Sequence, residues 1–330
     1  MIMLSYHHGI KIIRRRGAET WSTQTLLFFI FVVLLCCSML VNFIFLFKSP
    51  RYRSKCPHFT AELYQMNDLR NEVAELKNMV TFLAEPAITD HNYTYLLNPK
   101  NACREPLELL IVVPSAPGNF ARRMKVRQSS RADYANDPKN KARLVFFLGR
   151  QVSEGNDLET QLSVDEEAEK YGDIVQEDFV DVYRNIRLKA MSMLKWASTY
   201  CPRTRFVLRT DDDIRTNIPK TVAAMKRASQ RLANFILGLK EESTVPVRRS
   251  QGVNSKYFIS YEEYPEATFP PFAYGGLLGY PISTVKLLYQ ASLRVKPIWL
   301  DDVFITGLCA PKVNVALLSD PDIDFEHHAW

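Results

Sequence analysis

The sequence carries little excess charge of either sign. Its 42 lysine and arginine residues stand against 36 aspartate and glutamate residues, so the formal net charge is only +6. Much of this excess lies near the N-terminus, at Lys11, Arg14, Arg15, Arg16, Lys48, Arg51, Arg53 and Lys55. Such clusters on both sides of an apolar segment are typical of a membrane boundary rather than of a nucleic-acid-binding face. We therefore expect no nucleic-acid partner.

Charge is absent altogether from one long stretch, residues 26–47, and no second stretch of this kind exists. Its 22 residues are almost entirely apolar, which matches the length of about 20 residues that a bilayer-spanning helix needs. The apolar region of a cleaved signal peptide is shorter, about 7–15 residues, and no small residues suited to cleavage follow here. The sequence predicts an uncleaved signal anchor at 26–47, preceded by a tail at 1–25, in a single-pass membrane protein.

Glycosylation and cysteine signals are scarce, and both favour a lumenal body. Four basic residues lie on each side of the predicted span, so the charge rule for orientation does not decide. Asn92-Tyr93-Thr94 is the only standard N-glycosylation sequon. Four of the six cysteines, an even set compatible with two disulfides in an oxidising compartment, follow the span: Cys56, Cys103, Cys201 and Cys309. We predict a type II membrane protein with a short cytoplasmic tail, glycosylated at Asn92.

Residues 48–105 are predicted to form a stem. Within it, apolar residues recur at spacings of 3, 4, 3, 4 and 3, at Met66, Leu69, Val73, Leu76, Val80 and Leu83. This spacing is a heptad seam on a helix, which Pro86 ends. Because the seam covers under three heptads, two interpretations stay open: a homodimer through the stem helix, or one amphipathic helix packed on its own domain.

From about residue 106 the pattern changes to alternating strands and helices. Residues 107–115, 143–149 and 206–208 are apolar runs, as expected for central strands of a covered sheet. Helical patterns lie between them, at 119–131, in an acidic segment that breaks at Gly172, and at 182–200. This alternation predicts an α/β domain at 106–330 with a mostly parallel sheet, in which ligands bind at the carboxyl ends of strands.

Three consecutive acids, Asp211, Asp212 and Asp213, follow the strand predicted at 206–208. Residues i and i+2 of an extended segment point the same way, so Asp211 and Asp213 can face one ligand together. Two carboxylates aimed at one point need a counter-cation, and a hard divalent ion that also bridges phosphates suits their oxygens. Taken alone, such a motif is more often a solvated turn.

Six segments in the same order carry a family resemblance. The most specific is Y-G-D-I-V-Q-E-D-F-V-D-V-Y-R-N-I-R-L-K at 171–189, and F-V-L-R-T-D-D-D at 206–213 contains the acids. The others are R-R-M-K-V-R-Q-S at 122–129, V-F-F-L-G at 145–149, Y-G-G-L-L-G-Y at 274–280 and W-L-D-D-V-F-I-T-G-L-C at 299–309. Together they resemble the β1,3-galactosyl- and β1,3-N-acetylglucosaminyltransferases of glycosyltransferase family 31, over about 107–309.

The resemblance implies a GT-A-type, Rossmann-like fold and an inverting transfer of galactose or N-acetylglucosamine from a UDP-sugar to a glycan acceptor in β1,3 linkage. It also implies Mn²⁺ as the cofactor and the Golgi membrane as the location. An alternative is a catalytically inactive relative that acts as a chaperone or assembly partner of an active glycosyltransferase. The intact acids at 211–213 argue against that alternative.

The resemblance assigns roles to several residues around the donor. Asp213 and Asp211 are expected in the metal shell, with Asp211 also toward the nucleotide and Asp212 beside it in the donor site. Basic residues are expected to contact the nucleotide or its diphosphate, namely Arg122, Arg123, Arg127 and Lys189. For Arg122 and Arg123 a solvated basic helix face is the alternative.

Asp302 is the expected general base, because a carboxylate must take the proton of the attacking acceptor hydroxyl in an inverting transfer. Its neighbour Asp301 stands where the resembling family usually has glutamate, and helix capping is the alternative role for this pair. Near the C-terminus the resemblance suggests a histidine that completes the metal shell, with His328 preferred over His327.

The sequence also departs from the family pattern. Ser130 stands where the arginine-rich block of the family has tryptophan, and the cysteine usual beside the glycine turn is absent, with Pro271, Phe272 and Ala273 preceding Tyr274. One family disulfide is therefore missing or rewired, which leaves the pairing of Cys201 and Cys309 open. These departures indicate a divergent member.

Overall fold

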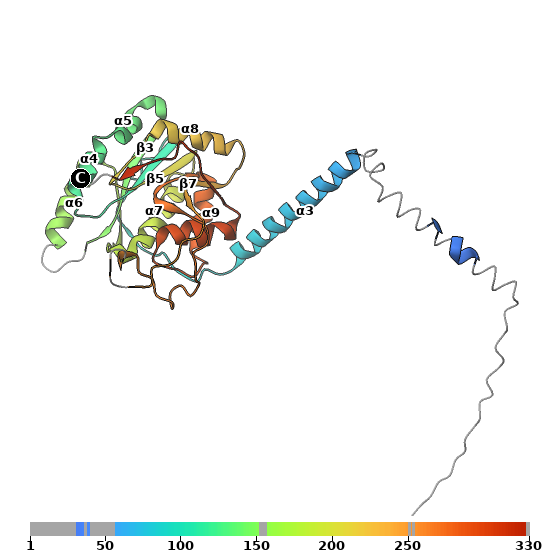
Figure 1. The fold of residues 1–330 in the computed structure, drawn as a ribbon. Coiled ribbons are helices and arrows are strands. Elements are labelled where there is room, and N and C mark those ends of the chain that lie inside the picture. The colour runs from blue at the N-terminus through green and yellow to red at the C-terminus, as the bar shows by residue number, and fades with distance from the viewer. Residues whose placement is uncertain are drawn as a thin grey trace, which may run out of the picture. The chain divides into compact units, whose positions relative to one another are not determined.

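The computed structural model describes residues 31–35, 38–39, 57–151, 157–249, 252 and 255–327. The chain divides into two compact units, Met1–Glu72 and Val73–Trp330, and Figure 1 labels some of their elements. Most of the predicted anchor at 26–47 lies outside the described residues. Within the described part of the chain, no helix is both long enough and apolar enough to cross a bilayer.

Helix α3 (Pro57–Ala84) contains the heptad seam and ends before Pro86. Five seam positions are exposed: Met66, Leu69, Val73, Leu76 and Val80. The last turn differs, because Met79, Phe82 and Leu83 pack against the hydrophobic core. Packing on its own domain therefore accounts for the end of α3 and not for the exposed part of the seam.

An eight-stranded sheet forms the centre of Val73–Trp330, in the order β1-β4-β3-β2-β5-β8-β7-β9. Its strands are β1 (Tyr95–Leu97), β2 (Leu109–Pro114), β3 (Ala142–Arg150), β4 (Ile174–Val180), β5 (Phe206–Thr210), β7 (Phe235–Glu241), β8 (Phe272–Pro281) and β9 (Ala316–Leu318). The four adjacent strands β4, β3, β2 and β5 are parallel to one another. Strand β8 lies between β5 and β7 and is antiparallel to both. The predicted α/β fold with a Rossmann-like parallel core is confirmed, and the sheet as a whole is mixed.

Helices cover both faces of this sheet (Figure 1). The core on one face includes residues of α7 (Ile186–Tyr200) and α9 (Ile282–Ser292), and Trp196 of α7 meets Phe147 of β3 edge to face with ring centroids 5.7 Å apart. The other face is covered by α4 (Phe120–Arg127), α5 (Ser130–Asn136), α6 (Asp157–Tyr171) and α8 (Ile218–Ser229). Since both faces are covered, every residue of β2 and β5 is buried, which explains the continuous apolar sequence of β2 and the apolar first three residues of β5.

Short elements connect and edge the sheet. A two-stranded sheet pairs β6 (Ile214–Arg215) with β10 (Glu326–His327). Single turns are η1 (Pro138–Asn140), η2 (Tyr183–Asn185), η3 (Ser255–Tyr257), the π-helix η4 (Val303–Cys309) and η5 (Ala310–Val313). Gly172 has a φ of +63°, where a side chain would be strained, and it separates α6 from β4 as the sequence predicts.

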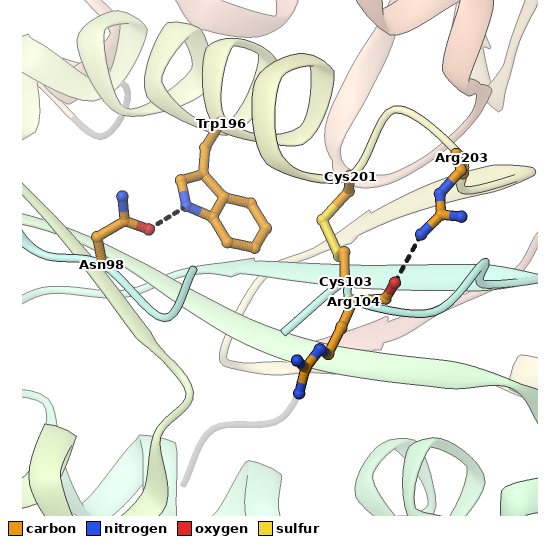
Figure 2. Close-up of a disulfide and its surroundings, with 6 residues drawn as sticks. All are labelled: Asn98, Cys103, Arg104, Trp196, Cys201 and Arg203. Atoms are coloured by element: carbon orange, nitrogen blue, oxygen red, sulfur yellow. Dashed lines mark hydrogen bonds between the residues drawn. A yellow bond between two sulfur atoms is a disulfide. The ribbon is translucent and has the colours of Figure 1, made fainter. Parts of the chain in front are cut away.

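One disulfide joins Cys103, in the segment before β2, to Cys201 at the end of α7, with 5.1 Å between their Cα atoms. Figure 2 shows it beside two hydrogen bonds, from Trp196 Nε1 to Asn98 Oδ1 at 2.9 Å and from Arg203 to the carbonyl of Arg104 at 2.6 Å. Cys309 is a free thiol buried in the core. The pairing that the sequence left open is thus decided for Cys201, whose partner is Cys103 and not Cys309, while Cys56 lies outside the described residues.

Replacing both Cys103 and Cys201 with alanine is expected to lower the free energy of unfolding by about 2–5 kcal/mol, since the bond closes a long loop. Urea unfolding of the oxidised proteins measures this difference. Dithiothreitol should lower the midpoint of the wild type toward that of the variant and leave the variant unchanged. A wild-type midpoint that does not respond to the reductant would contradict the prediction.

Candidate functional site

Asp212 lies at the carboxyl end of β5 and ties that end to the neighbouring β2–α4 connection. Its Oδ2 accepts hydrogen bonds from Ser115 Oγ at 2.7 Å and from Asn119 Nδ2 at 3.1 Å. Arg122 Nη1 reaches its Oδ1 at 3.2 Å. The side chain is buried, so these three donors satisfy a carboxylate that burial would otherwise destabilise. Its expected place beside the donor stays a prediction.

Asp213 and Asp211 have fewer partners. Asp213 is partly exposed and contacts Arg122 Nη1 at 3.3 Å. Asp211 Oδ1 lies 3.5 Å from Arg209 Nη2, and this buried oxygen has no hydrogen bond within the described part of the chain. Burial raises the pKa of Asp211 to about 6, with repulsion from Asp301, Asp213 and Asp212 added, although the Arg209 guanidinium opposes the shift.

This donor set fits a divalent cation, because Asp211 Oδ1 makes no hydrogen bond, Asp213 is partly exposed, and hard divalent ions prefer carboxylate oxygens. Among the described residues, no three His, Cys, Asp or Glu side chains lie close enough together to hold one metal ion. The two-stranded sheet pairs His327 with Ile214, the residue after Asp213, so the C-terminal segment runs beside the acids. His328, the expected third ligand, lies outside the described residues.

A second pair of acids stands at the start of η4. Asp302 Oδ1 accepts a hydrogen bond from its neighbour Val303 N at 2.8 Å, a capping contact. Burial raises the pKa of Asp302 to about 7, and the adjacent Asp301 adds to the shift, while backbone hydrogen bonds from Val303 and Gly275 oppose it. Asp301 is buried against Arg209, whose Nη1 lies 2.5 Å from its Oδ2.

A carboxyl with a pKa near neutrality is suited to general base catalysis, because it can accept a proton and still be ionised in much of the population. The capping hydrogen bond thus involves only one carboxylate oxygen of Asp302, Oδ1, and the second oxygen is left for another partner. The geometry gives Asp301 a different role, as the partner of a buried arginine.

Tyrosine side chains lie within electrostatic range of this carboxyl. Tyr183 packs against Trp299 with ring centroids 5.5 Å apart, and it is half exposed. Burial raises the pKa of Tyr183 to about 12, with contributions from Tyr257, Asp301, Asp302 and Asp211, so this phenol lies within electrostatic range of both acid groups. Tyr183 is thus an exposed ring in electrostatic range of the half-buried Asp302.

The predicted basic residues lie in different environments. Lys189 is buried, pairs with Asp181 at 2.8 Å and donates to the carbonyl of Ser115 at 2.6 Å, the residue whose hydroxyl donates to Asp212. Arg127 bonds Asp173 and Glu167, and no described contact joins it to the acids at 211–213. Their contacts with a nucleotide stay predictions.

For Arg123 the alternative of a solvated helix face is wrong, whereas for Arg122 it stays open. Arg123 is fully buried and bonds Glu167 together with the carbonyls of Ala116 and Pro117. Arg122 is half exposed, but its guanidinium is held by Asp212 and Asp213.

Three groups of the site were not predicted from the sequence: Arg209, Arg131 and the tyrosines near Asp302. Arg131 donates to Thr210 Oγ1 at 3.2 Å and to the carbonyl of Asp211 at 2.8 Å. Burial lowers the pKa of Arg131 to about 10, which still leaves it cationic at neutral pH. The signal for Arg209 was a charged residue inside the apolar run F-V-L-R-T. Nothing in the sequence alone set Arg131 apart from its basic neighbours.

Asn92 is exposed at the start of a short edge segment. Thr94 of its sequon bonds Asp178 through both its amide and its hydroxyl, each at 2.9 Å. Glycosylation of Asn92 stays a prediction.

A cavity of about 910 Å³ does not touch the acids. It opens at the amino end of β3, beside Arg143, Lys100 and Tyr171. A cavity of about 560 Å³ lies closer to the acids, against Ile214 and lined by the basic residues Lys125, Arg131 and Arg215.

Comparison with known sequences decides the family. The galactosyltransferase family profile matches residues 121–321, which is more than half of the chain and contains both acid groups. The chain belongs to the galactosyltransferase family. The predicted resemblance is thereby confirmed.

Two curated members of this family illustrate the likeness. Lactosylceramide 1,3-N-acetyl-beta-D-glucosaminyltransferase of Homo sapiens is 32% identical over 229 residues, which cover 68% of this chain and 59% of that protein. Beta-1,3-galactosyltransferase 5 of Gorilla gorilla gorilla is 33% identical over 265 residues, covering 79% of this chain and 80% of that protein. The chain thus spans less than two thirds of the length of the lactosylceramide enzyme.

Among solved structures, a mannosyltransferase from Pyrobaculum calidifontis in complex with GDP-Man and Mn²⁺ aligns with a TM-score of 0.33 and 13% identity, covering 77% of this chain and 68% of that one. The 4-diphosphocytidyl-2C-methyl-D-erythritol synthase from Anaerococcus prevotii aligns with a TM-score of 0.35 and 11% identity, covering 68% and 94%.

Proposed function

We propose that this family member is an inverting, Mn²⁺-dependent glycosyltransferase with a GT-A-type domain, which transfers galactose or N-acetylglucosamine from a UDP-sugar to a glycan acceptor in β1,3 linkage. The observation that carries the proposal is the pairing of two different carboxylate groups in one site. The acids after β5 offer a buried oxygen to a cation, and Asp302 has a pKa of about 7.

Asp211 and Asp213 would hold the cation, with His328 as a further ligand. When bound, the cation neutralises the charge of the departing diphosphate. Arg131 and Arg122 add fixed positive charge beside the acids. Asp302 accepts the proton of the acceptor hydroxyl while that oxygen forms a bond to the anomeric carbon. The bond from this carbon to the diphosphate oxygen breaks, and UDP leaves with its electron pair.

Release of UDP by the full-length protein in detergent tests the proposal. UDP-galactose, UDP-N-acetylglucosamine and UDP-N-acetylgalactosamine are each supplied with Mn²⁺ and with galactose- or N-acetylglucosamine-terminated acceptors, and the linkage is read by NMR. One donor is expected to be turned over in the presence of Mn²⁺ and not of EDTA. If no donor is turned over, the proposed activity fails, and the alternative of an assembly partner is favoured.

The proposal includes the Golgi membrane as location, with the anchor at 26–47 and a lumenal catalytic domain. The disulfide between Cys103 and Cys201 supports an oxidising compartment, because such bonds rarely persist in the cytosol.

We also propose that α3 pairs with the same helix of a second copy. The seam is apolar and exposed over five positions, whereas helix surfaces that face water are normally polar. Replacing Leu69 and Val73 with glutamate is expected to raise the dimer dissociation constant at least about tenfold, because charge then enters the seam. Sedimentation equilibrium measures this constant.

The matched control replaces Asn71 and Asn78 with glutamate. Both are exposed residues of α3 on the face opposite the seam, and this variant adds the same charge. A monomeric wild-type protein, or equal weakening by both variants, would contradict pairing through the seam.

A further inference from the structure

Arg209 is an arginine inside a central strand. It is the fourth residue of β5, where β2 pairs on one side through Val112 and β8 on the other through Leu278. Only 4% of its surface is exposed. A guanidinium at such a depth is strongly destabilising unless carboxylates satisfy it, so its partners indicate why the fold retains it.

The two carboxylates that form ion pairs with Arg209 come from the two acid groups of the site. Nη1 lies 2.5 Å from Asp301 Oδ2, and Asp301 directly precedes Asp302. Nη2 lies 3.5 Å from Asp211 Oδ1, the buried oxygen of the acids after β5. Segments 90 residues apart in the sequence, 211 and 301, are therefore joined through one planar side chain.

Gly275 of β8 completes the arrangement. A Cβ atom at this position would lie 3.1 Å from Arg209 Nη2 and 3.4 Å from its Cζ, closer than most such contacts. The Gly275 backbone also helps to lower the pKa of the adjacent Asp302 carboxyl. The glycine thus leaves room for the guanidinium beneath β8.

We infer that Arg209 is a positioning residue, which fixes Asp302 relative to the acids after β5 by holding Asp301 and Asp211 with its two terminal nitrogens. The inference rests on the proposed function. A base must stand in line with the acceptor hydroxyl and the anomeric carbon, and a displacement of about 1 Å can cost about 100-fold in rate. Lysine cannot hold both carboxylates at once, because its ammonium is a single point charge without a planar fork.

The inference can be tested by shortening the side chain at position 209 and lengthening its partner at position 301. Arg209→Lys is expected to lower kcat about 30- to 100-fold, because the shorter cation no longer reaches Asp301. Adding Asp301→Glu restores the reach from the other side, so the double variant should recover kcat at least about tenfold over Arg209→Lys. The KM for the UDP-sugar should not recover, because the contact with Asp211 stays lost. If Arg209 acted only through packing, the kcat losses of the two single variants would multiply in the double variant, and Asp301→Glu would not restore activity.

Arg227→Lys is the matched control, because Arg227 also bridges two carboxylates, Asp320 and Asp322, each at 2.7 Å, but on the exposed surface. Its kcat should stay within about twofold of the wild type, since exposed ion pairs contribute little. Gly275→Ala is a milder second variant for the case that Arg209→Lys does not fold. Its Cβ presses on the guanidinium, and kcat should fall at least about fivefold.

The possible failures are distinguishable. A wild-type protein without turnover contradicts the proposed function and, with it, this inference. An active wild type combined with unchanged kcat in Arg209→Lys or in Gly275→Ala, or with no rescue by Asp301→Glu, overturns the positioning role alone.

Discussion

Replacing Asp302 with asparagine is expected to lower kcat by about 10³-fold while the protein still binds UDP with Mn²⁺. The amide keeps the shape of the side chain and can still accept the hydrogen bond from Val303 N with its oxygen. It cannot take up the proton of an acceptor hydroxyl. A steady-state assay of UDP release, together with calorimetry of UDP binding, separates the two effects.

The pH profile of the wild type should report the same group. Since burial raises the pKa of Asp302 to about 7, the carboxyl is protonated below that pH and cannot act as a base. We expect kcat to fall about tenfold per pH unit below about pH 6, with a midpoint near pH 7. The residual rate of Asp302→Asn should lose this limb of the profile.

Stability should respond to Asp302 in the opposite direction. Its folded-state pKa lies above the ordinary value of 3.8, so the folded protein binds this proton more tightly than the unfolded chain does. The stability from this proton is fully present below about pH 4 and is lost as the pH rises to about 7. Asp302→Asn should therefore raise the free energy of unfolding at pH 8, on the order of 1–4 kcal/mol, and change it little at pH 4.

The exposed Asp165 on α6 provides the control, because Asp165→Asn makes the same chemical change outside the site. This variant should change kcat by no more than about twofold and the free energy of unfolding by no more than about 0.5 kcal/mol. Turnover of Asp302→Asn within tenfold of the wild type would show that another group accepts the proton.

The second large effect is expected at Asp213. Asparagine at this position removes a charged oxygen ligand, so the affinity for UDP in the presence of Mn²⁺ should fall at least about 100-fold, and turnover should fall with it. Asp211→Asn should act in the same way, because Asp211 Oδ1 has no hydrogen bond in the described chain. Calorimetry with Mn²⁺ and with EDTA measures the metal-dependent part of the affinity.

Asp212→Asn provides an internal comparison with a different expected phenotype. Its carboxylate accepts from Ser115, Asn119 and Arg122, so its loss should lower the free energy of unfolding by about 1–3 kcal/mol. Metal dependence should be retained. Equal behaviour of the Asp212 and Asp213 variants would contradict the separate roles that the structure indicates.

Several parts of the fold could be predicted because their signals are local. Six apolar residues in a row at 109–114 require a strand covered on both faces, and the structure buries all six. The end of the helix at Gly172 could be predicted because glycine, which has no Cβ, readily ends a helix. The observed φ of +63° agrees with this prediction. The acids could be placed at a strand end for the same reason, because the apolar run stops directly before them.

Other parts depend on contacts between distant segments. The spacing of cysteines does not encode which pairs meet, and the fold brings Cys103 to Cys201 across 98 residues while it buries Cys309. In the sequence, Arg123 looks like any other basic residue of a basic helix. In the fold its side chain is buried and donates hydrogen bonds to Glu167 and to two backbone carbonyls. No local pattern contains such partners.

By itself, the sequence determined the alternation of strands and helices, the position of the acids at the end of β5 and the family, because each depends on runs of neighbouring residues. Only the tertiary structure decided that Asp212 anchors a loop while Asp211 keeps an oxygen free of hydrogen bonds, and that Arg209 joins the acids after β5 to Asp301. The physical reason is that burial and pairing of charges depend on which segments pack together, and the pairing order of the sheet sets that packing.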